Sequence, residues 1–210
     1  MLPSCRRDGI GRFLSRSRFL VFAEFAPLFS DIVISEIRGV QDEQGESPFY
    51  KNLAQHFFKM DFKQADFINA TQGGQFISDL MPKYPIYVNL LHPKAQGVIG
   101  QPFNASRPAM QMLEREGFRH QGYIDVFDAG PTMQAERADI RTVEKSRRLP
   151  IADIGPVADE TQFYVCTTEL ANFRATVANV IETDHGVTLT PDVAKALGVS
   201  KGDFVRLVEA

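Results

Sequence analysis

Apolar residues recur at helical spacing near the start of the chain and then give way to a β-branched run. The pattern of residues 9–25 predicts a helix that ends at Ala26-Pro27. Residues 31–39 are rich in isoleucine and valine, which predicts a strand, and we place it at the centre of a sheet. Because side chains alternate along a strand, Glu36 and Arg38 are expected on one face.

The next apolar stripe has helical spacing and a helix-start signal before it. Ser47-Pro48 gives a cap residue followed by a first-turn proline. Residues 65–80 predict one or two short amphipathic helices, broken near Gly73-Gly74. The apolar stripe of the helix that begins at Ser47-Pro48 consists of Phe49, Tyr50, Leu53, Phe57 and Phe58.

The middle of the chain predicts short elements separated by turns. Residues 85–91 predict a strand or extended segment, and His92-Pro93 opens a short helix to about residue 99. Residues 104–118 have the cadence of the helix at 47–62, with Gly117 as its terminator, which suggests two related lobes. Residues 119–128 predict a strand, which Ala129-Gly130-Pro131 turns.

In the last third of the chain, apolar and polar residues alternate at period two, which predicts mostly strands. Residues 138–146 predict a charged, exposed helix, with Arg147-Arg148 as a solvated cap. A helix is expected from Thr190-Pro191 to Leu197-Gly198, with a turn at Lys201-Gly202-Asp203. The expected strands are residues 161–167, 173–181, 187–189 and 204–208.

Composition excludes several classes of protein. A net charge of −3 over 210 residues argues against a general nucleic-acid binder, and no run nears the roughly 20 apolar residues of a membrane span. Cys5 and Cys166 form no metal or redox motif, and the four histidines lack ligand spacing, so we expect no metal and a cytoplasmic location. The arginine- and serine-rich residues 1–30 could also pass for a transit peptide, but we favour a binding loop there.

That loop is Arg6-Arg7-Asp8-Gly9-Ile10-Gly11-Arg12, directly before the first helix. Gly9 and Gly11 let the backbone curl closely around a ligand, and the helix directs free N–H groups and its positive dipole end at the turn. Such a helix start is a ready site for a pyrophosphate. The pattern Arg6-x-x-Gly9-x-Gly11 resembles the pyrophosphate loop of the GNAT superfamily of acyl-CoA N-acyltransferases.

Longer segments resemble one family within that superfamily, the arginine N-succinyltransferases. The similarity runs in order along the chain and thins after about Leu149. The segments that carry it include Glu36-Ile37-Arg38-Gly39-Val40, Phe57-Phe58-Lys59-Met60-Asp61-Phe62, Phe76-Ile77-Ser78-Asp79-Leu80-Met81-Pro82, Val98-Ile99-Gly100-Gln101, Leu113-Glu114-Arg115-Glu116-Gly117-Phe118 and Tyr123-Ile124-Asp125-Val126-Phe127-Asp128.

The resemblance implies transfer of a succinyl group from succinyl-CoA to the α-amine of arginine, and of ornithine in related members. Succinyl-CoA would be a co-substrate, no cofactor would stay bound, and the chain would form a homo- or hetero-oligomer. The implied fold is α+β or α/β, built from GNAT-like lobes. We expect residues 1–62 to be the second half of a first lobe, 63–149 a second lobe, and 150–210 a small β-rich subdomain.

The chain departs from the family pattern in two places. Family members carry a sizeable portion before the loop, so the first lobe is expected to be incomplete, through a late start, a truncated gene or strands supplied by a partner. The family's proton-donor histidine falls, by the register of Val98-Ile99-Gly100-Gln101, on Phe103, so the catalytic residue is unknown. Among the histidines, His92 is nearest in sequence and reads as a helix cap, while His120 and His185 read as solvent-facing.

Carboxylates are the expected partners of a substrate guanidinium, because they accept paired hydrogen bonds from it. Glu36 and Asp42 are the candidates, with Asp125 and Asp128 as further possibilities, while a salt bridge with Arg38 or the first helix is an equal alternative for Glu36. Three interpretations stay open at this point: an active arginine N-succinyltransferase, a catalytically silent subunit that binds CoA or completes a full-length partner, or a decayed gene fragment without function.

Overall fold

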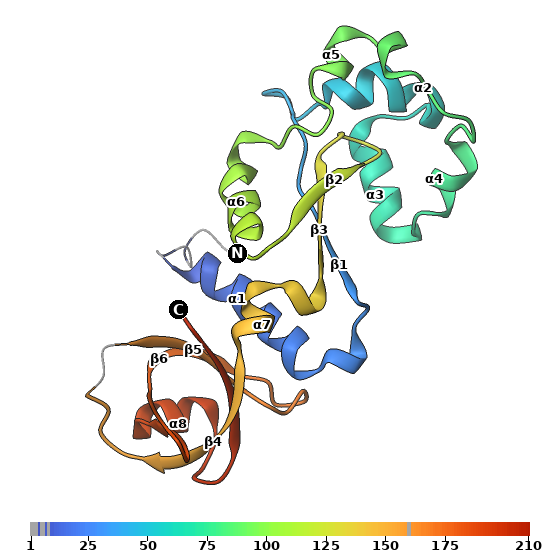
Figure 1. Cartoon of the computed structure of the whole chain (residues 1–210). Helices are drawn as coiled ribbons and strands as arrows, with labels where there is room; N and C mark the ends of the chain where they lie inside the picture. Colours follow the sequence, from blue (N-terminus) through green and yellow to red (C-terminus); the bar gives the residue numbers. More distant parts are fainter. Residues whose placement is uncertain (1–3, 5–6, 8, 159–160) are drawn as a thin grey trace. The chain divides into compact units, whose positions relative to one another are not determined.

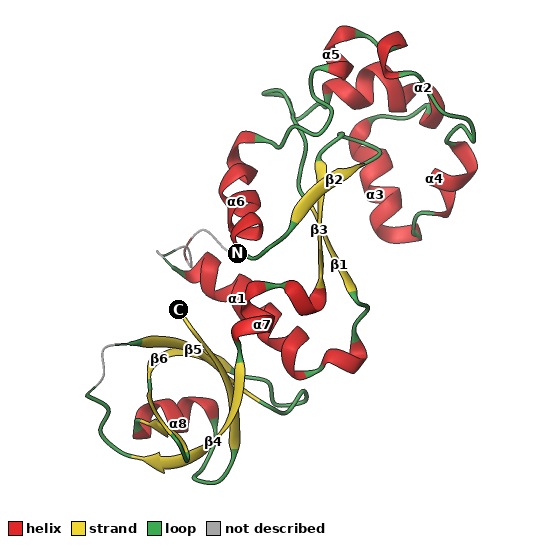
Figure 2. Ribbon diagram, in the orientation of Figure 1, coloured by secondary structure: helices red, strands yellow, loops and turns green. Residues whose placement is uncertain are grey.

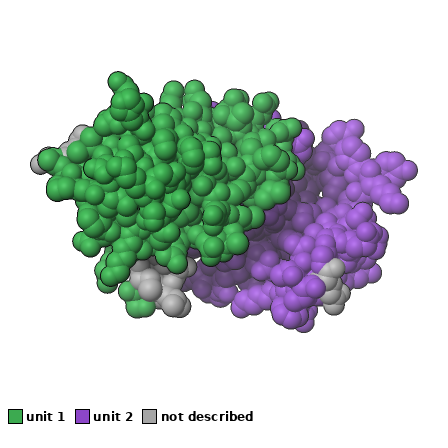
Figure 3. Space-filling model, turned by 90° about the horizontal axis from the view of Figure 1, so that it is seen from below, with its two compact units in different colours: residues 1–33, 136–210 green, residues 34–135 purple. Residues whose placement is uncertain are grey.

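A computed structural model describes residues 4, 7, 9–158 and 161–210 of the chain. The residues form two compact units (Figure 3). Unit 1 combines Met1–Val33 with Glu136–Ala210, and unit 2 is Ile34–Ala135. The domain boundaries at residues 62 and 149 stay a prediction.

Unit 1 begins with the expected first helix, α1, at Ile10–Glu24. The 3-10 turn η2, Ala26–Leu28, follows it where Ala26-Pro27 was expected to end the helix. Leu20 is fully buried in a cluster with Tyr164, Cys166 and Val208. The apolar face of α1 is therefore covered by residues far along the chain within the same unit.

The rest of unit 1 is a six-stranded sheet in the order β6-β5-β9-β4-β8-β7, whose strands curve around one short helix (Figure 1). Neighbouring strands pair antiparallel except β4 and β8, which are parallel. The core is aliphatic apart from Phe163 and includes Ile151, Val165, Val187 and Leu207. The elements are η6 Arg137–Asp139, α7 Arg141–Lys145, β4 Arg147–Ile154, β5 Gln162–Thr167, β6 Ala175–Asn179, β7 Ile181–Thr183, β8 Gly186–Leu189, α8 Pro191–Leu197 and β9 Phe204–Glu209.

β5, β8, β9 and α8 confirm the period-two and capping patterns of this region. The expected strand at residues 173–181 is divided between β6 and the start of β7, which lie at opposite edges of the sheet, and β4 was not predicted. The interpretation of Arg147-Arg148 as a solvated cap is wrong, because both arginines lie in β4, where residues 147–150 pair with β9. Arg147 forms an ion pair with Glu182 (2.6 Å) and Arg148 one with Glu24 (3.1 Å). Both acidic partners are distant in sequence, so the local pattern could not reveal that these two arginines lie on a strand.

Unit 2 contains a three-stranded sheet in the order β1-β3-β2. Its strands are β1 Ile32–Glu36, β2 Arg119–Ile124 and β3 Pro131–Glu136. The predicted central position of β1 is wrong: β3 occupies the centre, and its alternate residues from Pro131 are buried. The side chains of Ile32, Ile34 and Glu36 are exposed along β1, as expected of an edge strand.

α6 (Arg107–Arg115) leads into one end of β2, whereas helices α2 (Gln55–Phe58), α3 (Phe62–Gln72) and α4 (Gln75–Leu80) gather around the other end, where β2 turns into β3 (Figure 2). Their shared core is aromatic and contains Tyr50, Phe58, Phe62 and Phe127. The break at Gly73 is confirmed, because that residue has a φ of 80°. The elements are the π-helical turn η3 Tyr50–Ala54, α2 Gln55–Phe58, α3 Phe62–Gln72, α4 Gln75–Leu80, the 3-10 turn η4 Val88–Leu90, α5 Pro93–Gln96, the 3-10 turn η5 Asn104–Ser106 and α6 Arg107–Arg115.

Residues 85–91 form no strand, so the strand alternative is wrong and the extended alternative holds only for the first part of the segment. Val88–Leu90 is a 3-10 turn closed by a bond from the Leu90 N–H to the Tyr87 carbonyl (3.0 Å). Pro82 and Pro85 lack N–H groups, which removes donors that a ladder needs.

Candidate functional site

The expected anion loop lies at the start of α1. Arg6 and Asp8 lie outside the described residues, whereas Arg7, Gly9, Gly11 and Arg12 are exposed and Ile10 is half-buried. Gly9 has a φ of 81°, a left-handed conformation that favours glycine. The Gly9 carbonyl accepts the Phe13 N–H at 2.9 Å, which begins the helix.

Among the described residues, the space around this helix start is open. A Cβ atom on Gly9 or Gly11 would meet no atom within 4 Å. Among the described residues, the first turn of α1 carries no acidic side chain that would offset the positive end of its dipole. The geometry therefore leaves room and favourable charge for an anionic group, and Gly9 is required by its backbone angle rather than by crowding.

Unit 2 contains a cavity of about 220 Å³ at the end of β1. Its walls come from β1 and the two residues after it, from α3, and from the turn between β2 and β3. Phe62 and Phe127 are buried and give it an apolar side, while four carboxylates, one guanidinium and one side-chain amide supply its polar groups. The lining residues are Glu36, Ile37, Arg38, Phe62, Asp66, Asn69, Asp125, Phe127 and Asp128.

Asp128 fixes this cavity in place. One carboxylate oxygen, Oδ2, accepts the Gly39 N–H at 2.9 Å, and Oδ1 accepts the Gly130 N–H at 2.9 Å. Burial raises the pKa of Asp128 above its ordinary value, although the two N–H bonds act in the opposite direction. A Cβ on Gly39 would lie 2.2 Å from the Asp128 carbonyl oxygen, so only glycine allows this approach. Asp128 is thus a structural bridge between β1 and the turn.

The other carboxylates of the cavity accept fewer hydrogen bonds from the backbone. Asp125 uses Oδ1 to accept the N–H groups of Phe127 (2.8 Å) and Asp128 (3.0 Å), which leaves Oδ2. Glu36 is exposed, and among the described residues it forms no ion pair with Arg38 or α1. Sequence reasoning missed Asp66 and Asn69, because nothing in the local pattern of α3 connects it to β1.

Asp42 is not among the residues that line this cavity. Its Oδ1 accepts the N–H groups of Gln44 (3.0 Å) and Glu46 (2.9 Å). This arrangement closes the polar turn after β1 and is a structural role common for aspartate.

Phe103 lies beside the end of β1. Its N–H donates to the Arg38 carbonyl at 2.8 Å, and Pro102 next to it pairs with Gly39. The position that the family register assigns to a proton donor is therefore next to a residue of the cavity, but it carries a hydrocarbon ring.

Two histidines have defined surroundings in unit 2. His92 confirms the capping interpretation, because its Nδ1 accepts the Lys94 N–H at 3.2 Å at the start of α5. His120 is exposed as expected, and its Nδ1 lies 3.3 Å from the Thr132 carbonyl oxygen. Since a carbonyl only accepts, a hydrogen bond here is donated by Nδ1, while Nε2 lies close to Gly100.

The residues that the structure describes hold neither a cluster of metal ligands nor a membrane-spanning helix. In that part of the chain, no group of three or more histidine, cysteine, aspartate or glutamate residues could hold a metal ion. None of its helices has the length and apolarity needed to cross a bilayer. Cys166 is a buried free thiol, and burial raises its pKa to about 12, so it is not a ready nucleophile.

Comparison with known proteins identifies relatives along the whole chain. Residues 1–142 match the model of the arginine N-succinyltransferase beta subunit family, and residues 147–209 match that of its C-terminal domain. An arginine N-succinyltransferase of Yersinia enterocolitica is 43% identical over 208 residues, which is 98% of this chain and 60% of that protein. The arginine N-succinyltransferase subunit beta of Pseudomonas aeruginosa is 42% identical over 208 residues, which is 99% of this chain and 61% of that protein.

A solved structure gives the same result. The arginine/ornithine succinyltransferase subunit AI from Pseudomonas aeruginosa aligns with a TM-score of 0.82 and 34% identity, over 100% of this chain and 60% of that one. The chain thus spans about 60% of the length of the relatives it matches. The expected mixed α and β acyltransferase-like fold is confirmed, and the chain belongs to the arginine N-succinyltransferase family.

Proposed function

We propose that this chain takes part in the transfer of a succinyl group from succinyl-CoA to the α-amine of arginine. The observation that carries the proposal is the acid-lined cavity at the end of β1, in a chain of this family. Relatives named arginine N-succinyltransferase match 98% of the chain, so the alternative of a silent subunit is not favoured.

The reaction makes specific demands on a site. The α-amine nitrogen attacks the thioester carbonyl carbon, the carbon–sulfur bond breaks, and CoA leaves as a thiolate that takes up a proton. The amine must lose a proton to a base for the amide to form. Hydrogen-bond donors near the carbonyl oxygen lower the energy of the charged intermediate.

The helix start at Gly9–Arg12 would hold the pyrophosphate of succinyl-CoA, which binds and leaves as a co-substrate. Backbone N–H groups of the first turn of α1 and the guanidinium groups of Arg7 and Arg12 supply positive charge there. We include Arg6, Asp8 and Ile10 in this loop from the sequence pattern.

The cavity of unit 2 would hold the substrate guanidinium. Glu36 and the free Oδ2 of Asp125 supply acceptors, with Asp66 at the same cavity, and a carboxylate binds a guanidinium through paired hydrogen bonds. Asp128 is not assigned this role, because both of its oxygens already accept N–H bonds. Asp42 is left out because it closes a turn.

Assembly and location complete the proposal. Two Pseudomonas aeruginosa relatives are named as subunits, which supports an oligomer for this chain. The free, buried Cys166 suits a reducing compartment, and we place the protein in the cytoplasm.

A thiol-release assay on the purified chain, with succinyl-CoA and arginine, tests this function. We expect turnover, and we expect Glu36→Gln to raise the KM for arginine about tenfold or more while the KM for succinyl-CoA stays unchanged. The control is Glu43→Gln, an exposed carboxylate in the turn after β1. Absence of both turnover and CoA binding by calorimetry would refute the proposal, and equal effects of the two variants would refute the role of Glu36.

A further inference from the structure

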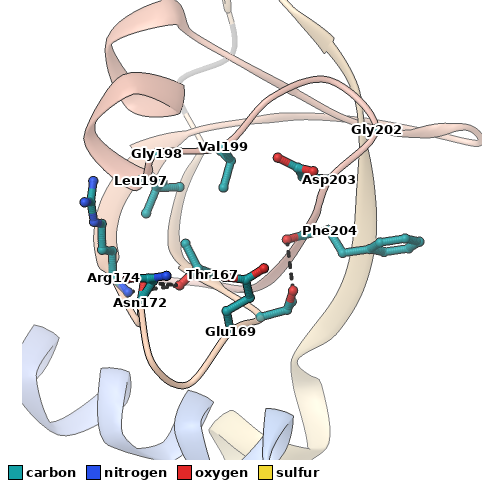
Figure 4. Close-up of a pocket in the computed structure, with 11 residues that line it drawn as sticks. Thr167, Glu169, Asn172, Arg174, Leu197, Gly198, Val199, Gly202, Asp203 and Phe204 are labelled. Atoms are coloured by element: carbon teal, nitrogen blue, oxygen red, sulfur yellow. Dashed lines mark hydrogen bonds between the residues drawn. The ribbon is translucent and has the colours of Figure 1, made fainter.

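Unit 1 contains a larger cavity, of about 510 Å³, which lies entirely within the C-terminal β-rich region (Figure 4). Three segments line it: the loop between β5 and β6, the residues that end α8, and the turn that leads into β9. The volume falls within the range of small-molecule sites. No residue of this cavity is used in the proposed transfer reaction.

The loop between β5 and β6 is held in position by hydroxyl groups. The buried Thr167 Oγ1 donates to the Asn172 carbonyl (3.2 Å) and accepts the Arg174 N–H (2.9 Å). Thr168 Oγ1 donates to the Phe204 carbonyl at 3.4 Å, which connects the loop to the start of β9. The wall is thus formed before any ligand arrives, so binding would cost little ordering of the loop.

Two carboxylates of this cavity are without a cationic partner among the described residues. Asp203 uses Oδ2 to accept the Ser200 N–H at 2.7 Å and keeps Oδ1, while Glu169 is exposed at the cavity. The nearby cation Lys201 is already paired with Asp153 at 3.1 Å. In Figure 4 the Glu169 and Asp203 side chains border the same hollow, so a ligand with a positive group could meet both.

Arg174 gives the cavity one positive group. Its Nη1 donates to the Ala196 carbonyl at 3.2 Å, near the end of α8. A Cβ on Gly198 would lie 3.0 Å from the same Nη1, so the guanidinium lies against this glycine. No described residue accepts a hydrogen bond from Nε or Nη2, so these N–H groups remain for a ligand carboxylate. Leu197 and Val199 add an apolar wall between the charged groups.

We propose that this cavity is a second ligand site that binds an amino acid with a basic side chain. Arg174 would bind its α-carboxylate, Glu169 and Asp203 its cationic groups, and Leu197 and Val199 its methylene chain. Two carboxylates and one guanidinium give the cavity a charge of −1, which matches a ligand of charge +1. A neutral amino acid lacks the group for the carboxylates, and an amine without a carboxylate lacks the group for Arg174.

Amide chemical shifts of the whole chain test this site with L-arginine as the probe. On addition to about 10 mM, which would saturate a millimolar site, we expect saturable shifts at Asn172, Gly198 and Gly202. The double variant Glu169→Gln/Asp203→Asn should weaken this binding at least about tenfold, because Asn keeps the bond to Ser200 while both charges are lost. The control Glu144→Gln, an exposed carboxylate on α7, should bind as the parent chain does.

Two further measurements distinguish L-arginine from an amine without a carboxylate, and this site from the proposed substrate cavity. Agmatine, which lacks the carboxylate, should bind about tenfold more weakly than L-arginine, and Arg174→Gln should reduce L-arginine to the level of agmatine. Glu36→Gln should leave the shifts at Gly198 and Gly202 unchanged, so this site and the proposed substrate cavity fail independently. The proposal is overturned by the absence of saturable shifts at the three amides, by binding that survives the double variant, or by equal affinity for agmatine.

Discussion

The two cavities are held open by different bonds. In unit 2 a buried carboxylate, Asp128, joins the N–H groups of Gly39 and Gly130. In unit 1 neutral hydroxyls of Thr167 and Thr168 tie a loop to neighbouring carbonyls. Hydrogen bonds to a charged group contribute about 1.5–3 kcal/mol each and neutral ones about 1 kcal/mol, so unit 2 depends more heavily on a single residue.

The difference extends to the packing around each cavity. Gly39 and Gly130, beside the cavity of unit 2, approach the neighbouring backbone so closely that a Cβ on Gly130 would overlap the Ile37 carbonyl oxygen. In unit 1, the closest approach of Gly198 is to the flexible end of Arg174. The cavity of unit 2 should therefore respond sharply to small changes, and that of unit 1 mildly.

The largest expected effect is that of Gly130→Ala. The added methyl would overlap backbone atoms of Ile37, Arg38 and Gly39, which cannot move without separating β1 from the turn. We expect a loss of about 3 kcal/mol or more in the free energy of unfolding, measured by denaturant titration. Gly155→Ala is the control, because its Cβ would meet only the Asp153 carboxylate at 3.9 Å. Comparable stability of the two variants would contradict the tight approach.

Asp128→Asn should have the next largest effect. The asparagine carbonyl oxygen can accept one of the two glycine N–H groups, while the side-chain NH₂ faces the other donor and leaves it unpaired. We expect a loss of about 1–3 kcal/mol in the free energy of unfolding. Asp139→Asn, in the exposed turn η6, is the matched control. A stable Asp128→Asn chain with an intact unit 2 would argue against the bridge.

The pH dependence of stability gives a smaller effect from the same residue. Burial raises the pKa of folded Asp128 above the ordinary value of 3.8, so the folded chain holds this proton more tightly than the unfolded chain does. The contribution of this proton to stability is complete below the ordinary pKa and is lost as pH rises through the folded pKa. Denaturant unfolding across this window should show the fall in the parent chain, and Asp128→Asn should lack it.

The sequence predicted the elements of unit 1 better than those of unit 2, for a physical reason. Alternation at residues 161–167 and 204–208 reports burial on one face of a sheet, and β5 and β9 lie there. In unit 2, β3 has the sequence Pro-Thr-Met-Gln-Ala-Glu, in which threonine is the one residue type enriched in strands. Its central position depends on pairing with β1, about a hundred residues earlier, and no local pattern encodes that.

The candidate site shows the same limit. Glu36, Asp125 and Asp128 were proposed from residue type, and the structure brings all three to one cavity. The sequence could not predict which of these carboxylates keeps an oxygen for a ligand, because that depends on the backbone N–H groups from which each one accepts hydrogen bonds. The unit 1 cavity was not predicted either, since its loop, helix end and turn meet only after the sheet has formed.

Thr167→Val should have the smallest effect, and it tests the prediction that the cavity of unit 1 responds only mildly to small changes. Valine keeps the shape of threonine but removes the hydroxyl, so the Arg174 N–H and the Asn172 carbonyl lose a partner while water can reach the exposed loop. We expect a loss of about 1 kcal/mol in the free energy of unfolding, with the sheet intact by amide spectra. Thr176→Val is the control, because that hydroxyl makes only a long bond of 3.4 Å to the neighbouring carbonyl. A loss as large as that of Gly130→Ala would mean that the two units depend equally on single residues, and a loss equal to that of Thr176→Val would mean that the hydroxyl does not hold the loop.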